Sequence, residues 1–181
     1  MKLRLCLCSF IVMVSPLAAA DDPVTHTLDR QLSSTEKEFV SLVEAMPADK
    51  FNFAPKDGAF NGVRTFALEA KHAAFILDQI SAALLGEKNP SPEGPGENGP
   101  ANLTGKDEIV KYVKDAFAYA HRAVATVNGS NLMQQTVDPF DAKTRRARFD
   151  STSMMFWHTY DHYGQMVEYA RMNNVVPPAS R

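Results

Sequence analysis

The chain has 181 residues, of which 45% are hydrophobic and 22% are charged, and it carries 19 basic against 21 acidic side chains. This length is typical of one domain that buries a sizeable core. The slight acidic excess argues against nucleic acid as the main partner.

Residues 1–20 have the pattern of a secretory signal peptide. Two basic residues precede an apolar stretch over residues 5–17, and a run of alanines ends at Ala20. We therefore expect cleavage near Ala20, a secreted or periplasmic location, and a mature domain over residues 21–181 with no membrane association after cleavage. Both cysteines lie within residues 5–17, so the mature domain is expected to contain no thiol.

Two segments of the N-terminal half have apolar residues at helical spacing. The first runs from about residue 24 to 46 and the second from about 63 to 85, where Gly86 is placed to end it. An irregular connection that includes residues 51–58 separates them. The predicted inward stripe of the first helix is Leu28, Leu32, Thr35, Phe39, Leu42, Val43 and Met46.

Residues 87–102 are rich in proline, glycine, asparagine and glutamate. No hydrophobic pattern continues through this stretch, and a long segment of this composition is typical of an exposed loop. We interpret it as a mobile loop or a lid.

The C-terminal half contains two more helical patterns. Thr104 and Asp107 resemble a capping box that opens a helix over about residues 106–127, and a short helical piece is expected around 132–136. The last helix is expected over about residues 144–172, with its basic start interpreted as a solvated helix end. The predicted inward stripe of the third helix is Ile109, Val110, Val113, Phe117, Ala120 and Val124.

No segment shows the alternation of a β-strand. Four helices of about twenty residues or more, joined by modest loops, predict an all-α protein with a four-helix bundle. Bundles of this kind place metal sites in their cores, with ligands from facing helices.

Two histidines four residues apart are the most specific feature of the last helix. His158 and His162 lie one turn apart on the same helix face, where their nitrogens could converge on one metal ion at about 2.0–2.1 Å. The alternative is that both rings donate hydrogen bonds to carbonyl or tyrosine groups of a neighbouring helix.

Three other histidines could supply a third ligand. His26 lies close to the predicted new N-terminus, where the chain frays. His121 lies beside the apolar stripe of the third helix, and His72 lies in an alanine-rich stretch of the second helix. Periodicity alone ranks His72 only slightly above His121.

The chain resembles the DinB family in three separated motifs that follow in the same order. They are Glu44 to Phe51; Val63 to Phe66 followed by His72 to Ala74; and Asp161 to Gln165 with Tyr169 to Met172 and Val175 to Pro178. The resemblance covers nearly all of residues 21–178, and the proline- and glycine-rich loop is its least similar part. It implies a bundle of up-down-down-up type and, as in many relatives, a homodimer.

The resemblance also implies the metal ligands. These would be His72, His158 and His162, holding one divalent cation with a coordination position left open, which is the arrangement of catalytic rather than structural zinc. We expect zinc or nickel, although imidazole ligands also suit iron, copper and cobalt. Beyond this ion, no cofactor is expected.

Two carboxylates lie close to the predicted ligands in sequence. Asp161 and Glu69 could each orient a ligand histidine or act as a general base, or could instead belong to the polar edge of their helices. Catalytic residues beyond these two candidates are not assigned by the sequence.

Characterised relatives include thiol-dependent S-transferases and isomerases. The resemblance therefore implies a metal-dependent transferase whose thiol comes from a cosubstrate, because the mature domain has no cysteine. A hydrolase that uses metal-activated water is the other enzymatic interpretation, with a small molecule as substrate. The alternative to an enzyme is an exported protein that binds a metal or small ligand without turnover, or that serves in a stress response.

Overall fold

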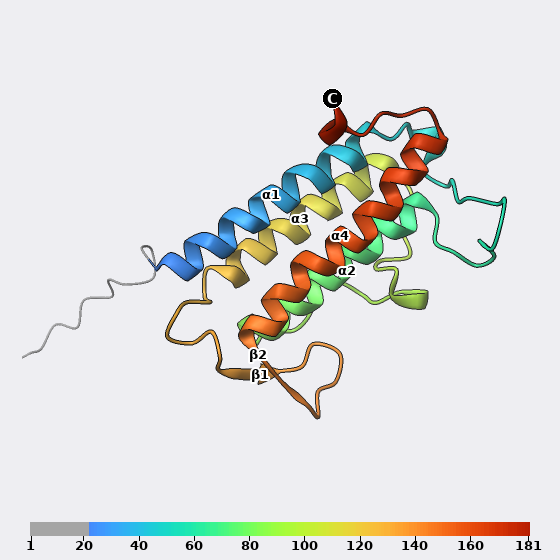
Figure 1. Cartoon of the computed structure of the whole chain (residues 1–181). Coiled ribbons are helices and arrows are strands. Elements are labelled where there is room, and N and C mark those ends of the chain that lie inside the picture. The colour runs from blue at the N-terminus through green and yellow to red at the C-terminus, as the bar shows by residue number, and fades with distance from the viewer. Residues whose placement is uncertain (1–21) are drawn as a thin grey trace, which may run out of the picture.

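The computed structural model describes residues 22–181, and the predicted signal peptide at residues 1–20 lies outside the described residues. The described chain forms four long helices and one small hairpin (Figure 1), which confirms the all-α bundle. The helices are α1 (Pro23–Ala45), α2 (Phe66–Leu85), α3 (Lys106–Val124) and α4 (Arg148–Met172), and the strands are β1 (Gln135–Val137) and β2 (Arg145–Ala147). Three 3₁₀ turns cover Ala48–Lys50, Pro95–Glu97 and Pro178–Ser180.

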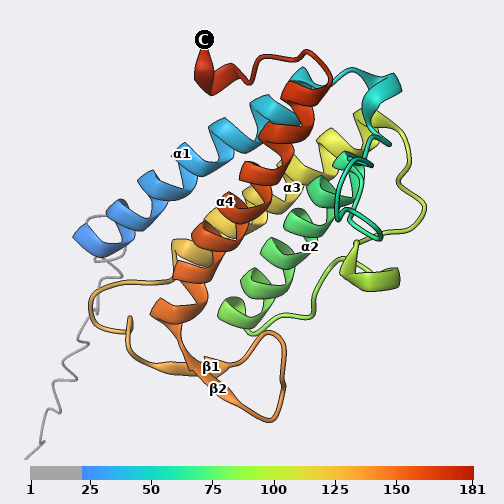
Figure 2. The same ribbon diagram turned by 45° about the vertical axis from the view of Figure 1, so that its right-hand side comes forward.

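The helices have the up-down-down-up arrangement. Helices α1 and α4 run in one direction and α2 and α3 in the other (Figures 1 and 2). Each of α1 and α2 packs against both α3 and α4. Because α2 and α3 are parallel, the loop over residues 86–105 must return along the whole bundle, and this accounts for its length.

The core lies between the four helices. Every residue of the stripe predicted for α1 is buried, so this part of the prediction is confirmed. Phe39 of α1 packs on Phe117 of α3 with ring centroids 6.0 Å apart. Burying one side chain of this size contributes about 1.5–3 kcal/mol, and the stripe therefore fixes which face of α1 turns inward.

Helix α2 is buried on nearly all sides. It packs against α3 and α4 in the bundle, and the hairpin and the 86–105 loop also contact it. Its buried polar residues are Glu69, Lys71, His72, Asp78 and Ser81. Buried polar groups are costly unless they are hydrogen-bonded, so these side chains require partners in the elements that cover α2.

The hairpin corrects two predictions. The piece expected as helix around residues 132–136 includes the start of β1, and the basic start expected for the last helix includes β2, which pairs antiparallel with β1. Helix α4 therefore begins at Arg148 and not at residue 144. Strands of three residues are too short for a visible alternation of polar and apolar residues.

Arg148 is a structural contact and not a solvated helix start. Its guanidinium donates to the carbonyl of Leu84 at 3.1 Å and to the carbonyl of Thr126 at 3.1 Å. These carbonyls lie where α2 and α3 end, and a cation there satisfies acceptors that the helices leave unpaired.

One helix start and one helix cap also differ from their predictions, although α3 begins at Lys106 as predicted. Helix α2 begins at Phe66, three residues late, because the Thr65 hydroxyl caps it by accepting from the amide of Leu68. The cap of α3 is formed by Glu108, whose carboxylate accepts from the amide of Gly105 at 3.0 Å, and not by Thr104 and Asp107.

The 86–105 loop is held against α2 by side chains. Lys71 Nζ donates to the carbonyl of Leu103 at 3.1 Å, and the Ser91 hydroxyl donates to Asp78 Oδ2 at 2.5 Å. Gly99 and Pro100 of the loop are buried. Lys71 and Asp78, two of the buried polar residues of α2, thus receive their partners from the loop that follows it.

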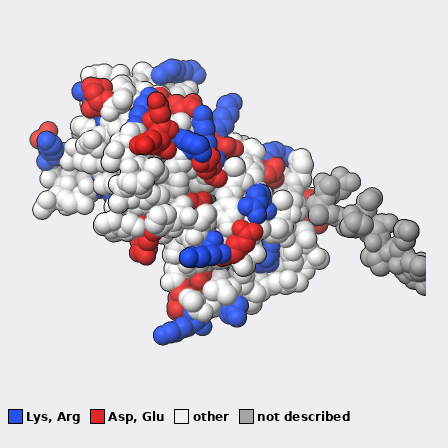
Figure 3. Space-filling view, turned by 180° about the vertical axis from the view of Figure 1, so that it is seen from behind, with Lys and Arg blue, Asp and Glu red and all other residues white. Residues whose placement is uncertain are grey.

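The surface and the helix lengths add two observations. Seen from behind, basic and acidic side chains lie interspersed over the molecule (Figure 3). Among residues 22–181, no helix has both the length and the apolar character that a membrane span requires.

The first prediction concerns Asp78. Burial raises the pKa of its carboxyl to about 6, so the folded protein holds this proton more tightly than the unfolded chain does. The contribution of Asp78 to the free energy of unfolding should therefore fall as pH rises from about 4 to about 6, by on the order of 1–3 kcal/mol. Asp78→Asn should remove this fall and raise the stability at pH 7.5.

Urea unfolding at pH 4.5, 6 and 7.5 measures the effect. Asp57→Asn, which changes an exposed carboxylate in the connection between α1 and α2, is the matched control and should leave the pH profile within about 0.5 kcal/mol of the wild type. An Asp78→Asn variant that is less stable than the wild type at pH 7.5 would contradict the argument.

Candidate metal centre

The three predicted ligand histidines come together between α2 and α4. The ring centroids of His72 and His162 lie 4.6 Å apart, those of His158 and His162 4.5 Å, and those of His72 and His158 5.2 Å. One ligand atom from each ring lies within 4.8 Å of the other two. No other group of three metal-binding side chains this close is found over residues 22–181.

Hydrogen bonds fix the tautomers of two of these rings. His72 Nδ1 lies 2.8 Å from the carbonyl oxygen of Glu97. A carbonyl only accepts, so Nδ1 carries the proton and donates it. His162 Nδ1 lies 2.5 Å from Glu69 Oε2 and donates in the same way to this carboxylate. A neutral ring that donates through Nδ1 has an unprotonated Nε2, which is the atom that binds a metal ion.

The ring of His158 faces the ring of His162. Nε2 of His158 lies 3.3 Å from Nε2 of His162. Two nitrogens bound at about 2.0–2.1 Å to a tetrahedral ion are separated by about 3.3–3.4 Å. The observed separation therefore fits two ligands of one ion, and the donor set fits a divalent transition metal.

Burial disfavours the charged forms of His72 and His158. His72 and His162 are 5% and 6% exposed. Burial lowers the pKa of His72 and lowers that of His158 to about 3, and the nearby Arg64 guanidinium lowers both further. Because a histidine must be neutral to bind a metal, these two rings are in the ligating form at neutral pH.

The two candidate carboxylates have different environments. Glu69, on α2, is 2% exposed and orients His162. Asp161 is exposed on α4, and its Oδ2 accepts a hydrogen bond from Gln165 Nε2 at 3.2 Å. Glu69 is therefore the carboxylate that touches the histidine cluster, and Asp161 lies on the outer edge of α4.

The remaining histidines lie elsewhere. His26 is exposed on α1. His121 of α3 lies between two carboxylates of α1, with Nδ1 2.6 Å from Asp29 and Nε2 3.1 Å from Glu36. Neither histidine belongs to the cluster formed by α2 and α4.

One part of the site was not predicted from the sequence. The carbonyl that holds His72 belongs to Glu97, whose backbone has the left-handed φ of 59°. This conformation occurs in a tight turn where a Cβ on Gly94 would lie 2.0 Å from the carbonyl oxygen of Gly99. The Gly-Pro-Gly run at residues 94–96 was visible in the sequence, but it indicated a loop and not a contact to a ligand.

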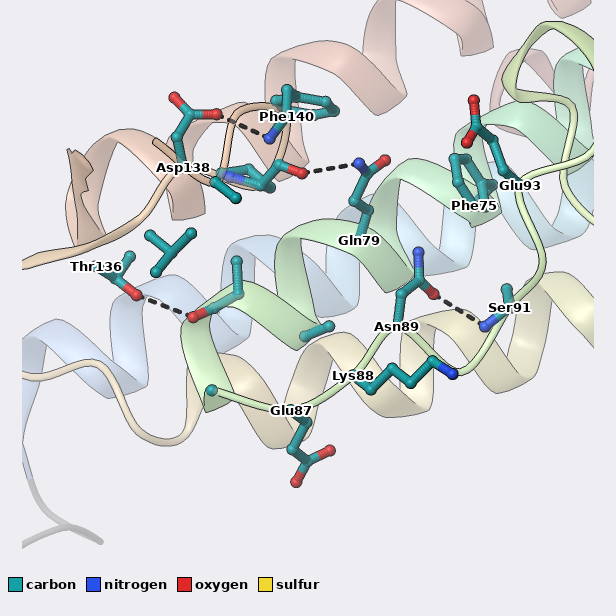
Figure 4. A pocket seen from close by; sticks show the side chains of 16 residues that line it. Phe75, Gln79, Glu87, Lys88, Asn89, Ser91, Glu93, Thr136, Asp138 and Phe140 are labelled. Carbon is teal, nitrogen blue, oxygen red and sulfur yellow. Dashed lines mark hydrogen bonds between the residues drawn. The ribbon is translucent and has the colours of Figure 1, made fainter. Parts of the chain in front are cut away.

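A small cavity adjoins the cluster. It measures about 390 Å³ and is lined by Gly62, Val63, Arg64, Glu69, Gly96, Asn98 and Gln165. A larger cavity of about 700 Å³ lies between α2, the start of the 86–105 loop and the hairpin, where Phe75, Gln79 and Phe140 line it (Figure 4). Neither cavity is lined by the three histidines, but the smaller one includes Glu69, the partner of His162, and is therefore the candidate approach to the metal centre.

Comparison with known proteins identifies one family. The family model of the DinB superfamily matches residues 31–166. The match covers most of the chain and includes all three histidines of the cluster. A search of curated proteins finds no significant match.

The second prediction concerns Glu69. Glu69→Gln keeps the size of the side chain but removes the negative charge that orients His162, and the loss of such a partner typically weakens metal binding by about 10–100-fold. Competition with a chelating dye for Zn²⁺ measures the affinity. Glu168→Gln, an exposed change on α4, is the control and should bind as the wild type does; equal affinity in both variants would show that Glu69 has no orienting role.

The third prediction concerns the turn that positions Glu97. A Cβ at Gly94 would clash with the Gly99 carbonyl, so Gly94→Ala must shift the turn and with it the acceptor for His72. We expect Zn²⁺ affinity to fall by about tenfold with little loss of helical content. Gly164→Ala, where no atom lies within 4 Å of the added Cβ, is the matched control; unchanged Zn²⁺ binding by Gly94→Ala would rule out the turn as a part of the site.

Proposed function

The chain belongs to the DinB superfamily, and from this premise we propose that it binds one divalent metal ion through Nε2 of His72, His158 and His162 and acts on a small molecule. The observation that carries the proposal is the convergence of the rings, since one ligand atom from each lies within 4.8 Å of the other two. Two of the three donate through Nδ1 to fixed acceptors, and the unprotonated nitrogens are left for the ion.

A purely structural role for the histidines is less consistent with these contacts. Rings that serve only packing would be expected to use both nitrogens on carbonyl or hydroxyl groups. Here Nε2 of His158 and Nε2 of His162 face each other at 3.3 Å. Two lone pairs at this distance repel each other unless a proton or a metal ion lies between them.

Zinc or nickel is the proposed ion. Three imidazoles with a coordination position left open are typical of catalytic sites. An ion held in this way lowers the pKa of a bound thiol or water molecule and so supplies a nucleophile near neutral pH.

The side chains around the cluster then have separate tasks. Glu69 holds His162 and also lines the small cavity, and we propose that its carboxylate accepts a proton from a substrate there. The carbonyl of Glu97 holds His72. Arg64, Asn98 and Gln165 line the same cavity and supply polar contacts to a bound molecule.

The proposed reaction class is transfer or hydrolysis. Residues 21–181 contain no cysteine, so a thiol nucleophile in a transferase reaction must come from a cosubstrate. We also propose that residues 1–20 direct export and are removed, on the strength of their sequence pattern. Recovery of an uncut N-terminus from the exported protein would contradict this last point.

The fourth prediction tests the metal. Elemental analysis of the purified protein, after loading with Zn²⁺ or Ni²⁺ and gel filtration, should find about one ion per chain. His158→Ala should reduce this to less than a fifth, because it removes one of three ligands. His121→Ala is the control, since His121 lies between α1 and α3 away from the cluster; a wild-type protein that retains no ion would refute the proposed function.

Turnover separates an enzyme from a binding protein. The loaded protein should transfer a small thiol to an electrophilic acceptor or hydrolyse a member of an ester panel, and His162→Ala should abolish the reaction. Stoichiometric metal without turnover across both panels would favour an exported metal or small-ligand binding protein.

A further inference from the structure

The small cavity beside the metal centre contains a single basic side chain, Arg64. This residue directly precedes the capping residue of α2 and is half-buried. Its Nε donates to Asn98 Oδ1 at 2.7 Å, and its Nη2 donates to the carbonyl of Gly96 at 3.1 Å. The turn that supplies the acceptor for His72 therefore also holds the guanidinium in place.

Both partners of Arg64 are uncharged. A guanidinium has five N–H groups, and two are used here, so three remain without a hydrogen bond to any described residue. No carboxylate oxygen of residues 22–181 lies within 4.0 Å of this side chain. The positive charge is thus oriented by the protein but is not neutralised by it.

The charge balance of the cavity favours an anion. Glu69 is the one acidic residue among the lining side chains, and its carboxylate already accepts the proton of His162. The guanidinium lies close enough to act electrostatically on His72 and His158. With a divalent ion on the histidines, the cavity would hold two cationic centres against one carboxylate.

The remaining lining residues leave room for such a ligand. Gly62 and Gly96 contribute no side chains, and Asn98 and Gln165 contribute amides. A cavity of about 390 Å³ suits a small molecule and not a polymer. Arginine binds carboxylate and phosphate groups with paired, parallel hydrogen bonds.

We propose that the substrate of this site is a small molecule with an anionic oxyacid group, a carboxylate or a phosphate, which Arg64 binds while the reacting end of the molecule faces the three histidines. This inference rests on the proposed function, because it assigns the substrate class of the same metal site. Arg64 is on this view a specificity-determining residue and not a metal ligand.

Titration of the Co²⁺-loaded protein tests the proposal without any assay of activity. The visible absorption of Co²⁺ reports ligands that reach the ion. The probes are succinate and glycerol phosphate, their uncharged counterparts succinamide and glycerol, and azide as an anion too small to span the ion and Arg64. The wild type should bind at least one of the two oxyacid probes at least tenfold more tightly than its uncharged counterpart, and the preferred probe identifies carboxylate or phosphate as the group bound.

Arg64→Gln should weaken the preferred probe by about 10–100-fold and change azide binding by less than threefold. Arg64→Lys should restore part of the affinity, because it keeps the charge but loses the paired geometry. Arg171→Gln, an exposed change near the end of α4, is the control and should bind as the wild type does. If Arg64→Lys restores affinity for the preferred probe, Arg64 recognises the charge of the probe and does not merely support the turn.

Failures of the two proposals are distinguishable. A wild-type protein that takes up no Co²⁺ refutes the metal site itself. A protein that takes up Co²⁺ and binds azide, but binds the preferred probe equally well with and without Arg64, or binds charged and uncharged probes alike, refutes the role of Arg64 alone.

Discussion

The contact between Glu69 and His162 is the interaction on which the rest of the site depends. It joins α2 to α4 in the core, where a carboxylate that is 2% exposed accepts the Nδ1 proton of a ring that is 6% exposed. A buried charge is costly unless it is paired and hydrogen-bonded, so each group requires the other. The same bond decides which nitrogen of His162 is unprotonated and turns it toward His158. One contact therefore links the packing of α2 on α4 to the orientation of His162.

The position of α2 explains why the loop that follows it is long and why it belongs to the site. Because α2 is covered on nearly all sides, its buried polar side chains cannot form hydrogen bonds to water and need partners in the protein. Lys71, His72 and Asp78 all find these partners in residues 91–103. The partner of His72 is a backbone carbonyl, which the turn presents by placing Glu97 in a left-handed conformation. The parallel course of α2 and α3 requires a return along the bundle, and this return satisfies the buried groups that it passes.

The helices and two of the three clustered histidines could be predicted from the sequence because they depend on local spacing. Apolar residues at helical intervals identify the buried faces, and a separation of four residues places His158 and His162 on one face. His72 required resemblance to a family, because the register between α2 and α4 is a tertiary property. Which of the two carboxylates, Asp161 or Glu69, contacts the histidine cluster depends on how each helix is rotated about its axis. The few residues around each carboxylate do not determine this rotation. The carbonyl of Glu97 could not be found at all, since every residue carries this group.

The contact between Glu97 and His72 also restricts how a substrate can enter. Interpretation of residues 87–102 as a free lid conflicts with this contact, because lifting the turn would remove the acceptor that keeps Nε2 of His72 unprotonated. The cavity beside Arg64 exists without such a movement and reaches Glu69, the partner of His162. Arg64 is bonded to Asn98 and to the Gly96 carbonyl, the two neighbours of Glu97 in the turn. In the proposed site, an anion bound by Arg64 therefore acts on the two residues that flank Glu97, whose carbonyl holds His72, and this couples the proposed recognition of the substrate to the geometry of the histidine cluster.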